Sequence, residues 1–374
     1  MTSDPLARQL AALDARGRLR RLVPRSGRDF ASNDYLGLAG DPIIGQAVAD
    51  AVAQGVPVGS GGSRLLRGNA PEHEALETQA AAFFGTQAAL FVGSGFAANC
   101  ALFAALPQRG DLIVADELIH ASVHDGIRVS KGTALYARHN DPQSFADIIA
   151  GWRAEGGKGR VWIAVETLYS MDGDMAPLTD LAAIAARNEA MLILDEAHAT
   201  GVFGLGGRGL SAGLDGRDDV VTLHTCGKAL GTEGALICGS RLVVDYLVNR
   251  ARPFIFSTAP SPLMAVAAGA ALERIALADD LRERLSVLRR DAAEDICGPL
   301  GLPRPRSQIL PIILGTDART MAVASALQER GFDVRGIRPP TVPAGTSRLR
   351  ISLTLNVGRP DIAALGDALR DLLA

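Results

Sequence analysis

Lys228 is the residue whose surroundings most clearly suggest chemistry. It lies in LHTCGKALG, residues 223–231, directly after the apolar run VVTLHT. An amine beside small residues in an apolar pocket is poorly solvated, which lowers its pKa and makes it a nucleophile; Thr225 adds a hydroxyl three residues earlier. Most single lysines instead lay their apolar stem along a helix surface. Because lysine at the end of a buried strand is rare without a functional reason, the position favours the nucleophile.

Asp195 and His198 follow another apolar run, in LILDEAHATG at residues 192–201. A carboxylate in such a low-dielectric place needs a cationic partner to stay ionised, and a protonated pyridine nitrogen would supply one. His198 could then hydrogen-bond an oxygen on the same ring. The ordinary alternative is a helix N-cap aspartate with a surface histidine. The letters DExH also occur in nucleic-acid motors, but the chain has no GxxxxGK[ST] loop, which weakens that interpretation.

Two further strand ends carry polar or flexible residues. In FVGSGFAAN, residues 91–99, a strand passes through Gly-Ser-Gly into a helix, whose N-terminal N–H groups suit a phosphate. This turn is a weak signal alone, and it is not the dinucleotide fingerprint GxGxxG. In VETLYSMDGDMAPL, residues 165–178, Glu166 and Ser170 follow a strand, although an ordinary polar loop explains that segment equally well. Together, the phosphate turn, carboxylate, histidine and lysine are the parts that bind pyridoxal phosphate.

The elements that must position these residues alternate between about residues 40 and 250. Helical runs separate short, nearly continuous apolar runs, the pattern of strands buried on both faces. Alternating strands and helices predict a mostly parallel sheet, with functional residues at the carboxyl ends of the strands. The apolar runs are AALFV, DLIVAD, VWIAVE, MLILDE, VVTLHT and GALICG.

The two ends of the chain follow different patterns. Residues 5–22 have helical periodicity and run into a stretch with six arginines between residues 16 and 28, which is mostly a solvated surface, although one or two could meet an anionic substrate. After about residue 255 we expect a long helix ending near residue 296, the strands ILPIILG and SRLRISLT, and helices at TMAVASALQERGF and DIAALGDALRDLLA, which together form a smaller α+β domain.

Composition excludes several other classes of protein. The 374 residues are 48% hydrophobic and 21% charged, with a formal net charge of −3, so neither disorder nor a nucleic-acid partner is favoured. Four cysteines without CxxC pairing suggest a reduced chain and no structural zinc; we expect no metal. Residues 78–108 lack charge, but glycines and Asn99 make helix, strand, turn and helix the simpler interpretation than a membrane span. The N-terminus has no apolar targeting segment, so we expect a cytoplasmic location.

Several motifs, in order along nearly the whole chain, resemble those of the α-oxoamine synthases, which are fold-type I pyridoxal-phosphate enzymes. The resemblance implies an aspartate-aminotransferase-like α/β fold: an N-terminal helical or extended segment at residues 1–37, a large domain with a mostly parallel seven-stranded sheet at 38–275, and a smaller α+β domain at 276–374. The motifs are ASNDYLGL (31–38), GSGGSRLLRG (59–68), GSGFAAN (93–99), DELIHAS (116–122), YSMDGD (169–174), DEAHATGVFG (195–204), TCGKALG (225–231) and IRPPTVPAGTSRLR (337–350).

The resemblance also implies roles for individual residues around pyridoxal 5'-phosphate. Lys228 matches the lysine that carries the cofactor as an internal aldimine, Asp195 the carboxylate at the ring nitrogen, and His198 the imidazole near the ring hydroxyl. His120 matches the histidine stacked on the ring, and Ser170 a serine that contacts the cofactor. The phosphate is matched by Gly95, Phe96 and Thr225, and by Ser257 and Thr258 reaching from the neighbouring subunit of a homodimer.

For the substrates, Arg350 matches an arginine that binds the amino-acid carboxylate, and Asn33 matches a residue near the active site in the family. Arg20 and Thr341 match positions that line the acyl-substrate side. The best match within the family implies a decarboxylative condensation of L-alanine with pimeloyl-CoA or pimeloyl-ACP, in biotin biosynthesis. Relatives that pair glycine with acetyl- or succinyl-CoA, or serine with a long-chain acyl-CoA, stay open, as does a cofactor-free binding protein on the same scaffold.

Two departures from the family pattern are visible. Ala199 stands where the family usually has glycine, at a cost of about 1 kcal/mol if the position needs a positive φ. After the last strand the family continues Ala-Ala-His, whereas this chain has Asn356-Val357-Gly358. Neither departure affects a residue with a chemical role.

Overall fold

A seven-stranded sheet carries the strand ends singled out above. The computed structural model describes residues 4–374. The strand order is β2-β8-β7-β6-β5-β3-β4, and all neighbours are parallel except β8, which runs antiparallel to β2 and β7. The predicted mostly parallel sheet of seven strands is therefore confirmed. The strands are β2 (Ala88–Val92), β3 (Leu112–Asp116), β4 (Thr133–Ala137), β5 (Val161–Glu166), β6 (Met191–Asp195), β7 (Val220–Thr225) and β8 (Ala235–Gly239).

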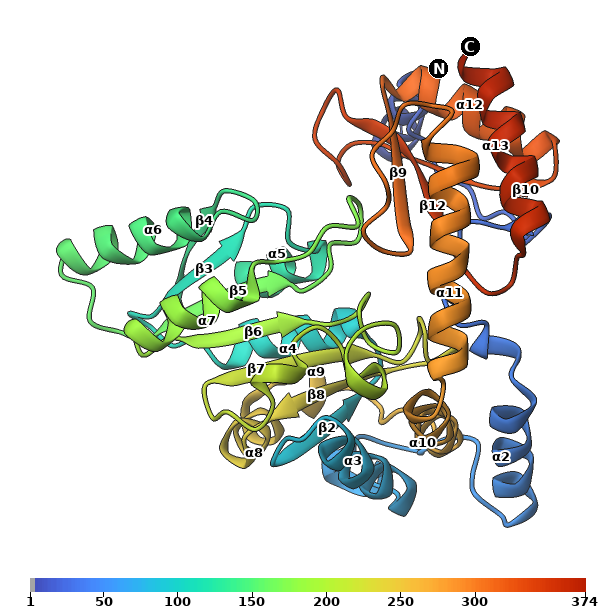
Figure 1. Ribbon diagram of the computed structural model, residues 1–374. Coiled ribbons are helices and arrows are strands. Elements are labelled where there is room, and N and C mark those ends of the chain that lie inside the picture. Colours follow the sequence, from blue (N-terminus) through green and yellow to red (C-terminus); the bar gives the residue numbers. More distant parts are fainter. Residues whose placement is uncertain (1–3) are drawn as a thin grey trace. The chain divides into compact units, whose positions relative to one another are not determined.

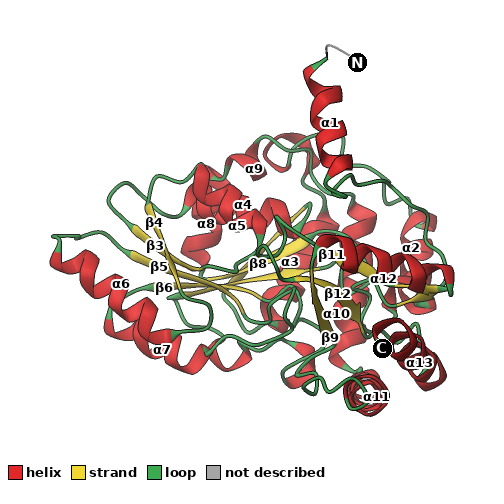
Figure 2. Ribbon diagram, turned by 90° about the horizontal axis from the view of Figure 1, so that it is seen from above, coloured by secondary structure: helices red, strands yellow, loops and turns green. Residues whose placement is uncertain are grey.

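The apolar runs form strands because both faces of the sheet are covered. Leu112 and Val114 of β3 join a core cluster with α6 (Pro142–Ala154) and α7 (Leu178–Arg187). Ile113, between them, points to the opposite cluster, formed with α4, α5, α8 and α9. Figure 2 shows these two groups of helices on opposite faces of the strands. The second group is α4 (Gly95–Ala105), α5 (Ala121–Arg128), α8 (Arg241–Arg250) and α9 (Arg252–Ile255).

The strand pattern missed β4. This strand is at the edge of the sheet, paired only with β3 among the described residues, and Leu135 and Tyr136 are exposed. Its sequence TALYA is itself mostly apolar, and the other edge strand, β2, is buried along its whole length and was predicted, so the omission of β4 has no explanation in its position at the edge.

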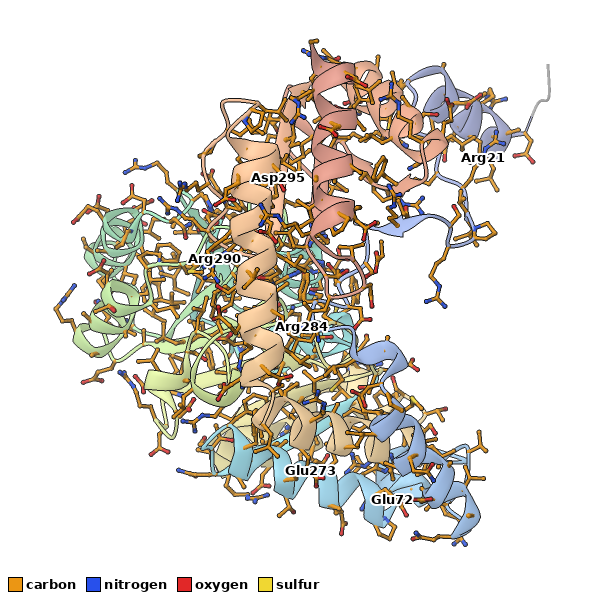
Figure 3. The ribbon with its side chains drawn as sticks, turned by 45° about the vertical axis from the view of Figure 1, so that its right-hand side comes forward. Arg21, Glu72, Glu273, Arg284, Arg290 and Asp295 are labelled. Carbon is orange, nitrogen blue, oxygen red and sulfur yellow. The ribbon has the colours of Figure 1, made fainter. Side chains whose placement is uncertain are left out.

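The helices before and after the sheet pack on one another. Helix α10 (Pro262–Ala276) contacts α2 (Pro42–Ala53) and α3 (Pro71–Phe83), and Figure 3 labels Glu273 on α10 and Glu72 on α3. Residues 78–108 form the predicted helix, strand, turn and helix, and no helix within residues 4–374 is long and apolar enough to cross a membrane. The connections around these elements contain four short helical turns, η1 (Leu38–Gly40), η2 (Arg64–Gly68), η3 (Leu205–Gly207) and η4 (Ala212–Leu214).

The chain forms two units. The sheet unit comprises residues 36–170 and 174–282, and the other comprises residues 4–35, 171–173 and 283–374. In the second unit a three-stranded antiparallel sheet has the order β11-β12-β9, and β1 pairs in parallel with β10. Figure 1 labels β9 and β12 of this sheet, and Figure 2 also labels β11. The three-part division at residues 37/38 and 275/276 stays a prediction. The strands are β1 (Arg28–Asp29), β9 (Ile309–Gly315), β10 (Phe332–Asp333), β11 (Arg335–Ile337) and β12 (Ser347–Ser352).

Two predicted helices are shorter than expected. The N-terminal helix α1 (Pro5–Ala15) ends before residue 22, because Gly17 adopts a positive φ of 63°. The long helix predicted after residue 262 is divided into α10 and α11 (Asp279–Ala292), followed by η5 (Ala293–Cys297). Figure 3 labels Arg284 and Arg290 along α11. The remaining helices are α12 (Asp317–Glu329) and α13 (Arg359–Leu373), close to their predicted ranges.

Candidate active site

A cavity of about 170 Å³ lies at the carboxyl ends of β5, β6 and β7 and the start of α4. Parallel strands bring their carboxyl ends to one edge, so residues far apart in the sequence meet there. Seven of the residues predicted to hold the cofactor line this cavity: Gly95, Phe96, His120, Asp195, His198, Thr225 and Lys228.

Lys228 and His198 are in direct contact within the cavity. Lys228 Nζ lies 2.8 Å from His198 Nε2, which is hydrogen-bond distance. Lys228 follows β7 and is half-buried, whereas His198 follows β6 and is 5% exposed. The amine is therefore held beside a group that can accept a hydrogen bond, with little bulk water around it.

Asp195, the last residue of β6, is buried and hydrogen-bonded at both oxygens. Its Oδ1 accepts from the backbone N–H of Ala197 at 2.9 Å, and its Oδ2 accepts from Asn99 Nδ2 at 2.8 Å. Donors to both oxygens stabilise the ionised form of a carboxylate. Asp195 can therefore present a fixed negative charge to a cation in the cavity.

Asn99 and Ser122, which the sequence analysis did not select as site residues, link Asp195 to His120. Asn99 Nδ2 also donates to Ser122 Oγ at 2.9 Å, and Ser122 Oγ lies 2.7 Å from His120 Nδ1. Desolvation lowers the pKa of His120, which keeps its ring neutral near pH 7. Asn99 and Ser122 end the motifs GSGFAAN and DELIHAS, so the signal was present, but their mutual contact was not visible from spacing.

The start of α4 forms the opposite wall. Ser94 caps the helix, its Oγ accepting from the backbone N–H of Ala97 at 3.1 Å. The N-terminus of a helix can bind an anion, because its backbone N–H groups donate hydrogen bonds and the helix dipole is positive there. A Cβ at Gly95 would lie 3.6 Å from Thr225 Oγ1, so the hydroxyl at the end of β7 is adjacent to the first turn of α4. This wall suits a phosphate.

Glu166, the last residue of β5, also lines the cavity and was not selected from the sequence as a site residue. Its Oε2 accepts from the backbone N–H of Ser170 at 3.0 Å. Ser170 is buried and is not among the residues lining the cavity. Its predicted contact with the cofactor stays a prediction.

Ser257 and Thr258 lie elsewhere, on the segment between α9 and α10. Both are exposed, and neither lines the cavity of its own chain. Their role in a neighbouring subunit stays a prediction.

The residues predicted for the substrates belong to the other unit. Arg350 of β12 is 7% exposed, and its Nη2 donates to Asn33 Oδ1 at 3.0 Å, which brings these two predicted residues together. Its Nη1 donates to Ser352 Oγ at 2.8 Å. Arg20 and Thr341 are exposed on loops, and no contact between the two is shown. The roles of all four stay predictions.

The two departures from the family pattern are accommodated locally. Ala199 is fully buried in a turn, its N–H donating to Glu196 O at 3.0 Å, and its φ is not positive, so the anticipated strain is absent. Asn356 donates from Nδ2 to Asp29 Oδ2 at 2.9 Å, and Gly358 is the N-cap of α13.

The chemistry of this cavity fits pyridoxal phosphate. It combines an amine, a buried carboxyl group, an imidazole and a helix N-terminus beside a hydroxyl, which match the aldehyde, pyridinium nitrogen, ring oxygen and phosphate of that cofactor. Among residues 4–374, no group of three or more His, Cys, Asp or Glu side chains is arranged to hold a metal ion.

Comparison with known proteins agrees with this fit. The family described as aminotransferase class I and II matches residues 27–364, and the chain belongs to this family. An 8-amino-7-oxononanoate synthase of Anaeromyxobacter dehalogenans (strain 2CP-1 / ATCC BAA-258) is 44% identical over 389 residues, covering 99% of this chain and 96% of the relative.

Two solved structures are similar over nearly the whole chain. A serine palmitoyltransferase with pyridoxal phosphate as an internal aldimine has a TM-score of 0.90 and 26% identity, with 99% of both chains covered. An 8-amino-7-oxononanoate synthase from Francisella tularensis has a TM-score of 0.77 and 29% identity, covering 93% of this chain and 97% of the other. These likenesses place the chain among the α-oxoamine synthases, with pyridoxal phosphate as its cofactor.

Proposed function

We propose that the protein condenses L-alanine with a pimeloyl thioester, releasing 8-amino-7-oxononanoate, CO₂ and the free thiol, as a step of biotin biosynthesis. The observation that carries this proposal is the meeting of Lys228, His198 and Asp195 in one cavity, in a chain 44% identical to a relative of that name. A cofactor-free binding protein would have no need to keep these three side chains together.

Asp195, Thr225 and the start of α4 hold the cofactor in this proposal. When bound, pyridoxal phosphate supplies an electron-withdrawing ring that stabilises negative charge at the α-carbon of the amino acid. Asp195, with both oxygens hydrogen-bonded, keeps the ring nitrogen protonated. In the proposal, Gly95 and Phe96 donate backbone N–H groups to the phosphate, Thr225 donates its hydroxyl, and Ser170 contacts the cofactor.

Lys228 binds the cofactor aldehyde at rest and moves protons during turnover. Its amine, when free, is the base that removes the α-proton of the amino acid, and it later returns a proton to the product. His198, 2.8 Å from Lys228 Nζ, orients the amine and supports the charge that develops when CO₂ leaves. The neutral ring of His120 stacks on the cofactor ring.

The second unit binds the substrates in this proposal. Arg350, already oriented by Asn33 and Ser352, offers its guanidinium to the carboxylate of alanine. Arg20 and Thr341 contact the acyl chain. We further propose a cytoplasmic homodimer in which Ser257 and Thr258 complete the phosphate site of the neighbouring subunit.

A second candidate function is that of another α-oxoamine synthase, which uses glycine or serine and a different acyl-CoA. The specific observation in its favour is the TM-score of 0.90 with a serine palmitoyltransferase, higher than the 0.77 with the oxononanoate synthase. The small difference between alanine, glycine and serine side chains is worth only about 1–3 kcal/mol in binding.

Thiol release, measured with a panel of amino acids and acyl-CoAs, tests the proposal. Alanine with pimeloyl-CoA should exceed glycine with acetyl-CoA and serine with palmitoyl-CoA by about tenfold or more in kcat/KM. A parallel arm with pimeloyl-ACP decides between the two donors. The Lys228→Ala variant is the control for enzyme-dependent release. A higher rate with serine and palmitoyl-CoA would overturn the proposed substrates in favour of the second candidate.

A further inference from the structure

Glu166 is a buried carboxyl group in the cavity that the proposed function does not use. It is 2% exposed, and it lies directly beside Asp195 in the register of strands β5 and β6. Two carboxyl groups therefore face one low-dielectric site from neighbouring strands. Like charges so placed do not both ionise readily, so one of the pair is expected to keep its proton.

The hydrogen bonds of the two groups differ. Asp195 accepts one N–H at each oxygen, whereas Glu166 accepts only the N–H of Ser170, at Oε2. Its Oε1 is buried and has no hydrogen-bond partner among residues 4–374. Burying an ionised oxygen without a hydrogen-bond partner costs free energy. A protonated oxygen is instead a hydrogen-bond donor, and a bound molecule can supply the acceptor.

Burial and the charges around Glu166 also favour a proton on this residue. Burial is the largest influence, and it raises the pKa of Glu166; Asp195 on β6 and Asp116 at the end of β3 raise it further. Lys228, beyond β7, and the N–H of Ser170 act in the opposite direction, and the resulting pKa is about 8. Glu166 is thus expected to keep its proton near neutral pH.

We propose that Glu166 keeps the proton of the Glu166–Asp195 pair near neutral pH and uses it, at Oε1, to donate a hydrogen bond to the bound cofactor. This role rests on the cofactor site described above. Of the two carboxyl groups, Asp195 then presents the negative charge to the ring, and Glu166 adds a neutral donor. Glu166 is a fixed donor, and its proton stays on Oε1 throughout.

Infrared spectroscopy of the cofactor-free protein tests the protonation state independently of any reaction. The carbonyl band of a protonated carboxyl group should be present at pH 6.5, disappear as the pH rises through about 8, and be absent from Glu166→Gln. Glu196 is the matched control, since it is fully buried and burial raises its pKa to about 7. Glu196→Gln should remove a different band and leave that of Glu166. If Glu166→Gln removes no band at pH 6.5, Glu166 is ionised and the proposal is wrong.

Cofactor affinity tests the hydrogen bond. Glutamine keeps a neutral donor, so Glu166→Gln should hold the Kd for pyridoxal phosphate within about threefold of wild type, whereas Glu166→Ala should weaken it about tenfold or more. Circular dichroism confirms that both variants fold. Equal weakening in the glutamine and alanine variants would overturn the proposal. Because these measurements use no amino acid or thioester, their failure is distinct from a failure of the proposed reaction.

Discussion

At the scale of single residues, His139 links the carboxylate of Asp116, at the end of β3, to the carboxylate of Asp174, in the loop between β5 and α7. Its Nδ1 lies 2.9 Å from Asp116 Oδ1 and its Nε2 lies 2.8 Å from Asp174 Oδ2. Desolvation opposes the charge, but the two hydrogen bonds outweigh it and raise the pKa of His139 from 6.5 to about 10. The charged imidazolium therefore holds the end of β3 to the segment that follows Ser170.

The stabilisation by His139 depends on pH in a defined direction. Because its folded-state pKa is raised, the contribution is complete below pH 6.5 and is lost as the pH rises through about 10. His139→Gln should lower the free energy of unfolding at pH 6 by about 1–3 kcal/mol, and the difference from wild type should shrink above pH 10. Urea denaturation between pH 6 and above pH 10 measures this difference in the free energy of unfolding. His124→Gln, at a histidine whose Nδ1 lies 3.1 Å from the hydroxyl of Tyr136 and which contacts neither Asp116 nor Asp174, is the control. A pH-independent difference would contradict the account.

The sequence predicted the residues that follow apolar runs and missed those defined by contacts between distant segments. Lys228, Asp195, His198 and Thr225 could be found because each stands at or just after a strand end. Asn99 and Ser122 could not, because their hydrogen bonds join positions 96 and 23 residues apart. Glu166 was noted at a strand end, but an ordinary polar loop explained its segment equally well, because its burial in register with Asp195 is a property of the folded sheet.

At the scale of elements, the phosphate site depends on the meeting of β7 and α4. Thr225→Val removes one hydroxyl and keeps the shape of the side chain. Loss of one hydrogen bond to a charged group should weaken pyridoxal phosphate binding by about tenfold or more. The affinity for pyridoxal, which lacks the phosphate, should stay within about twofold. Fluorescence titration of both compounds measures this difference. Equal weakening for both would show that Thr225 does not contact the phosphate.

The burial of each element decides which strands the apolar pattern could predict. Strands that are buried at every position need apolar residues on both faces, so β2, β3, β5, β6, β7 and β8 stand out from the sequence. Strand β4 was missed although its residues TALYA are mostly apolar, and Leu135 and Tyr136 in it are exposed. The end of α10 was missed because residues on either side of Leu277 keep a helical composition, whereas the acidic pair Asp279 and Asp280 begins a new helix.

At the scale of the whole molecule, the proposed homodimer predicts complementation between inactive chains. A Lys228→Ala chain lacks the amine, and a Thr258→Asp chain places negative charge where we propose that the partner's phosphate binds. Each homodimer should be inactive. Refolding them together should restore about one quarter of wild-type activity, because half of the dimers are mixed and each contains one intact site. Sedimentation velocity verifies the dimer. Without recovery in the mixture, Thr258 does not serve the neighbouring site.

The central claim is that Lys228 binds the cofactor covalently beside the carboxylate of Asp195. Borohydride reduction of the holoenzyme, followed by proteolysis and mass mapping, tests it most directly. The account predicts a single peptide carrying a phosphopyridoxyl group on the lysine of TCGKALG. A label on Lys131 or Lys158, the other lysines of the chain, or no label at all, would contradict it.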